Sequence, residues 1–162
     1  MLCFAFGADL DRDVRSAHIP EHRVVGLAAL RDHQLSFPRF SQEWGGGVAS
    51  IQTHHGDTLW GIVYDVSEAA LAELDRTEGF RGTGDAHNVA ERQVLLVELT
   101  RPDDGSVPRR LRVYAYVPRT SNATPPSERY RDALVQGAVQ HDLPEDYIAR
   151  LRAIPTVAAH SG

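Results

Sequence analysis

The chain is dominated by strand-like segments that short turn signals connect. Segments rich in apolar and β-branched residues, as strands are, lie at 2–6, 24–37, 48–52, 58–66, 89–99 and 111–117. The turn signals are Gly45-Gly46-Gly47, His55-Gly56-Asp57 and Pro102–Gly105. Because hairpin turns join antiparallel strands, this pattern predicts a mixed sheet that closes towards a barrel. The expected fold class is α+β, a small mixed, mostly antiparallel β-barrel with flanking helices.

Helical segments are expected at 10–16, 67–76, 127–141 and 144–153. Ser67 and Ser127 are good N-caps, Gly79 is a natural stop, and Pro144 suits a helix start. At 162 residues the chain fits one domain, which we place at 1–154. We expect residues 155–162 to form a frayed C-terminal tail.

Composition excludes several classes of function. The net charge of −5 gives no basic surface for nucleic acid or for an anionic membrane. All 17 basic residues are arginine, which excludes lysine-based catalysis, and the single Cys3 excludes an internal disulfide. With no signal peptide and no apolar run of about 20 residues, we expect a cytoplasmic protein without membrane partners.

Metal, nucleotide and serine-hydrolase motifs do not occur in the sequence. His18 and His22 are four residues apart, but Pro20 between them disfavours a shared helical face. No His-Glu-x-x-His or Gly-x-Ser-x-Gly pattern occurs, and Gly82-Thr83-Gly84 is not a phosphate loop. The sequence therefore predicts no metal site.

Glu78 stands at the end of the predicted helix, in the segment Leu74–Gly79. A glutamate in a last helical turn faces the negative end of the helix dipole, which disfavours its charged form by roughly 0.3–1 kcal/mol. That placement suits a proton-transfer group with a raised pKa. The local pattern alone is more typical of a solvated surface glutamate, and this alternative stays open.

Two further segments carry candidate binding groups. The junction Phe6–Leu10 joins a strand to a helix through Gly7, and its unpaired N–H groups could hold an anion. A plain connection with Asp9 as N-cap is the alternative. Tyr116 shares a strand face with Tyr114, where core packing is usual. Its buried hydroxyl would need a partner, and Glu78 could serve as one.

In their order and spacing these segments resemble the gamma-glutamylcyclotransferase-like (AIG2-like) family, over about residues 2–154. The matching segments are Phe6–Leu10, Gly46–Ala49, Trp60–Tyr64, Leu74–Gly79 and Leu143–Tyr147, with Tyr116, Pro125–Ser127, Tyr130 and Gly137-Ala138 between them. The resemblance implies a small barrel with a cavity for a gamma-glutamyl compound.

The resemblance also implies the chemistry. The substrate's alpha-amine would attack its own gamma-amide carbonyl and give 5-oxoproline and a free amine or amino acid, as in glutathione metabolism. Glu78 would be the general acid/base, and no cofactor or metal would be needed. The implied substrate-binding residues are Phe6, Gly7, Ala8, Asp9, Leu10 and Tyr116.

The first loop departs from the family pattern at three positions. Phe6 replaces the family tyrosine, Ala8 a serine and Asp9 an asparagine. Because these changes fall at the substrate end, the substrate is expected to differ from a simple gamma-glutamyl dipeptide. The alternatives are a non-catalytic small-molecule-binding protein on the same fold and an accessory domain of a larger amide-hydrolysing system. The oligomeric state, a homodimer included, stays open.

Overall fold

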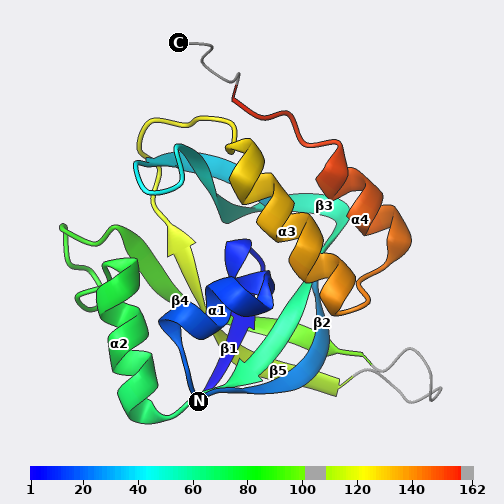
Figure 1. The fold of residues 1–162 in the computed structure, drawn as a ribbon. Coiled ribbons are helices and arrows are strands. Elements are labelled where there is room, and N and C mark those ends of the chain that lie inside the picture. Colours follow the sequence, from blue (N-terminus) through cyan, green and yellow to red (C-terminus); the bar gives the residue numbers. More distant parts are fainter. Residues whose placement is uncertain (101–108, 158–162) are drawn as a thin grey trace.

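The described strands close into a barrel in the order β1-β3-β2-β4-β5 (Figure 1). The structure is a computed structural model that describes residues 1–100 and 109–157. The strands are β1 (Leu2–Ala5), β2 (Arg23–Ser41), β3 (Gly46–Asp65), β4 (Ala90–Leu99) and β5 (Arg109–Pro118). Every neighbouring pair is antiparallel except β1 and β5, which are parallel. The predicted fold class is confirmed.

β2 and β3 form one long hairpin, which corrects two of the predicted boundaries. The chain reverses just before Gly46, so the glycine triplet marks a turn but its last two members belong to β3. The turn predicted at His55-Gly56-Asp57 is wrong, because β3 runs through it. The pairing jumps from Arg31 with Thr58 to His33 with Thr53, so this part of β3 bulges outwards. The predicted turn Pro102–Gly105 lies outside the described residues.

Four α-helices flank the barrel in the part of the chain that the structure describes. They are α1 (Arg12–His18), α2 (Glu68–Glu78), α3 (Glu128–Gln140) and α4 (Glu145–Arg152). Figure 1 shows α2 on one side of the barrel and α3 with α4 on the other. None of the described helices combines the length and the apolar character that crossing a bilayer requires.

The helix caps follow the sequence signals except at α1. The hydroxyls of Ser67 and Ser127 accept the N–H groups of the third residue along, so both predicted N-caps are confirmed. Helix α1 is capped by Asp11 rather than by Asp9, because a short 3-10 helix, Ala8–Leu10 (η1), comes first. In the described part of the predicted tail, residues 155–157, the Val157 N–H donates to the Pro126 carbonyl at 2.9 Å.

Helix α3 packs directly on the loop after β1. A Cβ added to Gly137 would lie 2.3 Å from the carbonyl carbon of Leu10 and 2.4 Å from the amide nitrogen of Asp11. Both neighbours are backbone atoms that a side-chain rotation cannot move away. Gly137 therefore fixes the distance between α3 and the loop.

We expect Gly137→Ala to lower the free energy of unfolding by about 1–3 kcal/mol, because the methyl group must push the helix off the loop. Helix propensity alone predicts that replacing glycine by alanine stabilises a helix, so the sign of the change in unfolding free energy tests the contact. Urea unfolding measures the effect. Gln136→Ala, on the exposed face of the same turn, is the control and is expected to change stability by less than about 0.5 kcal/mol. A stabilising Gly137→Ala would contradict the packing argument.

Candidate active site

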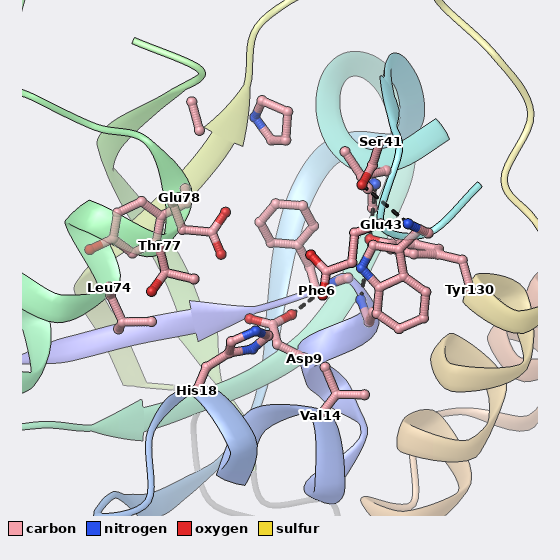
Figure 2. Close-up of a pocket in the computed structure, with 18 of the residues that line it drawn as sticks. Phe6, Asp9, Val14, His18, Ser41, Glu43, Leu74, Thr77, Glu78 and Tyr130 are labelled. Atoms are coloured by element: carbon pink, nitrogen blue, oxygen red, sulfur yellow. Dashed lines mark hydrogen bonds between the residues drawn. The ribbon is translucent and has the colours of Figure 1, made fainter. Parts of the chain in front are cut away.

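A cavity of about 280 Å³ lies between the loop after β1, the C-terminal end of α2 and the turn between β2 and β3 (Figure 2). The predicted site residues that line it are Phe6, Gly7, Ala8, Asp9, Glu78 and Tyr116. Leu10 does not line it, because its side chain is fully buried in the hydrophobic core. The fold thus brings Glu78 and the first loop together from positions about 70 residues apart in the sequence.

Glu78 is the last residue of α2, and its carboxylate points into the cavity (Figure 2). The helix stops there because Gly79 adopts the left-handed conformation with φ 71°. Burial, with the negative charges of Asp9 and Glu43 added, raises the pKa of Glu78 to about 7. Glu78 is therefore partly buried and faces the cavity rather than lying on the surface in full contact with solvent.

The amides of the first loop already make contacts within the protein. The Gly7 N–H donates to the Asp9 carboxylate at 3.2 Å, and the Ala8 N–H donates to the Tyr130 hydroxyl at 3.2 Å. The Leu10 N–H donates to the Gly7 carbonyl at 3.0 Å. The loop therefore faces the cavity with the Asp9 carboxylate as well as with backbone groups.

Tyr130, from α3, is a lining residue that the sequence did not single out as a site residue. Its oxygen accepts two N–H groups, from Ala8 at 3.2 Å and from Ala49 at 2.9 Å. Burial raises its pKa, so the phenol stays protonated at neutral pH. Both lone pairs of the oxygen are occupied by these N–H groups. The hydroxyl can therefore make one more hydrogen bond, as a donor through its own hydrogen. A Cβ at Gly7 would lie 2.7 Å from this oxygen, so glycine makes the approach possible.

Tyr116 lines the cavity but does not bond to Glu78, which corrects the expected partner. Its hydroxyl donates to Asp75 at 2.6 Å, one turn earlier on α2. Asp75 also pairs with Arg92 at 2.7 Å. The pair of contacts ties α2 to β4 and β5 and so fixes the helix end that carries Glu78.

Three carboxylates line the cavity. In Figure 2 the carboxylates of Asp9, Glu43 and Glu78 lie around a common space. Burial raises the pKa of Asp9, while Arg15 opposes that rise. Arg15 directs its guanidinium to the Asp9 and Leu10 carbonyls at 3.0 and 3.1 Å and to the His22 ring. The described residues contain no group of three metal-ligating side chains that could hold an ion.

Comparison with known proteins identifies the family. The AIG2-like family model matches residues 58–151. The gamma-glutamylcyclotransferases of Mus musculus and Homo sapiens are 28% and 29% identical over 157 residues, which is 94% of this chain and 78% of each relative. A solved structure titled "Gamma-glutamyl cyclotransferase" has a TM-score of 0.86 at 26% identity and covers 100% of this chain and 91% of its own. The chain therefore belongs to the AIG2-like family.

Proposed function

We propose that this protein is a cyclotransferase that converts a gamma-glutamyl amide, or a related gamma-amino amide, into a five-membered lactam and a free amine. The observation that carries the proposal is the Glu78 carboxylate, which is partly buried, points into a cavity opposite the first loop and has its pKa raised to about 7. Relatives named gamma-glutamylcyclotransferase support the same reaction class.

The reaction suits a site with so few functional groups. The substrate carries both nucleophile and electrophile, and well-oriented intramolecular reactions reach effective molarities of roughly 10⁵–10⁸ M. The amine nitrogen forms a bond to the gamma-carbonyl carbon, and the bond from that carbon to the leaving nitrogen breaks. Glu78 takes one proton from the ammonium before it attacks and a second from the same nitrogen as the ring closes, and it delivers them in turn to the leaving nitrogen. A carboxylate with a pKa near the working pH can do both.

Tyr130 supplies the group that stabilises negative charge in this proposal. The two N–H groups that it accepts hold its oxygen in place and polarise its O–H bond. The hydroxyl hydrogen is then a fixed donor for the carbonyl oxygen of the substrate as that oxygen becomes negative. Such preorganised donors contribute about 2.7–4 kcal/mol to transition-state stabilisation in comparable sites.

The test is a screen for lactam release from gamma-glutamyl amino acids, gamma-glutamyl amines and glutathione, with thermal unfolding in the presence of each compound. Time-dependent release of 5-oxoproline or a related lactam supports the cyclotransferase. Stabilisation by a compound that is never converted would support the alternative of a binding protein on this fold. The proposal would be overturned if no gamma-amino amide is converted and none stabilises the protein.

A further inference from the structure

We propose that Asp9 takes the place of a substrate carboxylate, so that the cavity selects a gamma-amino amide that lacks the alpha-carboxylate, namely a 4-aminobutanoyl amide. This inference rests on the proposed function and names its substrate class. The product would be 2-pyrrolidinone instead of 5-oxoproline.

The position of the Asp9 carboxylate carries the inference. It lines the cavity and accepts the Gly7 N–H at 3.2 Å, from its own loop. A backbone N–H at a strand-to-helix junction is the kind of donor that would receive a carboxylate from a ligand. Here the protein supplies that carboxylate itself. A ligand carboxylate at the same end of the cavity would meet a like charge.

The positive charges of Arg15 and His18 act to lower the pKa of Asp9, but neither forms an ion pair with its carboxylate. Within the described residues no arginine or histidine lies within ion-pair distance of its carboxylate. Arg15 lies behind the loop and donates to backbone carbonyls and to His22. The second lining guanidinium, Arg39, comes from the end of β2 that leads into the turn carrying Glu43.

Two more carboxylates, Glu43 and Glu78, face the same space (Figure 2). Three acidic groups around one cavity attract an ammonium and repel a carboxylate. A gamma-glutamyl group carries one of each, whereas a 4-aminobutanoyl group carries the ammonium alone. The second group therefore matches the charge of the cavity.

The cyclisation needs no group that the smaller substrate lacks. The 4-ammonium gives one proton to Glu78 and its nitrogen then bonds to the amide carbonyl carbon. As the carbon–nitrogen bond to the leaving amine breaks, the ring nitrogen loses a second proton. Glu78 passes the two protons in turn to the leaving nitrogen, which departs as an ammonium. The ring has the same five members as in 5-oxoproline. Only the carboxylate that would lie against Asp9 is missing.

The test compares N-propyl amides of 4-aminobutanoic acid and of gamma-glutamate as substrates of the wild-type protein and of Asp9→Asn. We expect wild type to favour the 4-aminobutanoyl amide by about tenfold or more in kcat/KM, since like-charge contacts weaken binding strongly. Asp9→Asn keeps the shape and the contact to Gly7, and is expected to reduce that preference by about tenfold or more. Asp11→Asn, which removes a buried charge of the same loop outside this cavity, is expected to keep the wild-type preference.

Binding measured calorimetrically in a Glu78→Gln background decides the inference even if neither amide is converted. There the 4-aminobutanoyl amide should bind more tightly, and Asp9→Asn should improve gamma-glutamyl binding relative to it. Asp9→Ser, checked for folding by thermal unfolding, repeats the test with a smaller neutral side chain. A wild-type preference for the gamma-glutamyl amide, or a preference that neither Asp9 variant changes, would overturn the inference. Turnover of the gamma-glutamyl amide alone would then leave the proposed function standing.

Discussion

Glu78→Gln is expected to lower kcat for lactam release by about 10²–10⁴-fold, the usual contribution of a general acid/base. Glutamine has nearly the same shape as protonated glutamate but can neither accept the ammonium proton nor return one to the leaving nitrogen. KM should change much less, because the proposed contacts to the substrate come from the first loop and Tyr130. Steady-state kinetics of lactam release at pH 7–8 measure both constants.

Glu73→Gln is the matched control, because Glu73 lies on the same helix with its side chain exposed and paired with Arg76. Its turnover should equal that of the wild type. A thermal melt shows that both variants are folded. If Glu78→Gln turns over within about threefold of wild type, Glu78 is not the proton-transfer group and the mechanism fails at its main step.

The barrel could be predicted because its determinants are local. Strand-like segments, turn glycines and serine caps each act within a few residues, so Ser67, Gly79 and Ser127 all do in the structure what their sequence context predicts. The error at His55-Gly56-Asp57 has a physical reason. A glycine with positive φ fits a bulge as well as it fits a reversal, and only the pairing of β3 with β2 distinguishes them.

The candidate site could be predicted only where one segment contains the signal. Glu78 stood out because the helix end that carries it is visible in the sequence. The Tyr130 hydroxyl reaches Ala8 and Ala49, which are 122 and 81 residues away, and no local pattern reports such contacts. The sequence analysis correctly predicted that the Tyr116 hydroxyl needs a hydrogen-bond partner. It could not distinguish Asp75 from Glu78 as that partner, because the two residues are three apart on one helix.

The three carboxylates that line the cavity connect function with stability. Glu78 gains its pKa of about 7 first from burial and then from the charges of Asp9 and Glu43. Each of these factors disfavours the ionised form that abstracts a proton. A site of this kind holds the pKa of its base near 7, and ionising that base in the folded protein lowers the free energy of unfolding.

The contribution of Glu78 to the free energy of unfolding should therefore be lost as pH rises from about 4.5 to about 7, and Glu78→Gln should remove this contribution. The pKa of Glu78 is raised from 4.5 to about 7 on folding, so the native state binds the proton more tightly than the unfolded chain does. Its stabilising contribution is complete below the unfolded pKa and is gone above the folded pKa. At 1.36 kcal/mol per pKa unit, the difference is about 3 kcal/mol. Urea unfolding at pH 4 and at pH 8 measures it.

To isolate the effect of Glu78, the free energy of unfolding of wild type is subtracted from that of Glu78→Gln at pH 4 and again at pH 8. The two differences are then compared. Near pH 4 the protonated glutamate and glutamine are almost equivalent, so packing differences between them appear there and can be subtracted. At pH 8 Glu78→Gln should be more stable than wild type by about 3 kcal/mol beyond that baseline. Glu73→Gln, with its exposed side chain, should show no such change. If the difference is the same at both pH values, the carboxylate is ionised in the folded protein without cost, and it is then not the buried base on which the mechanism depends.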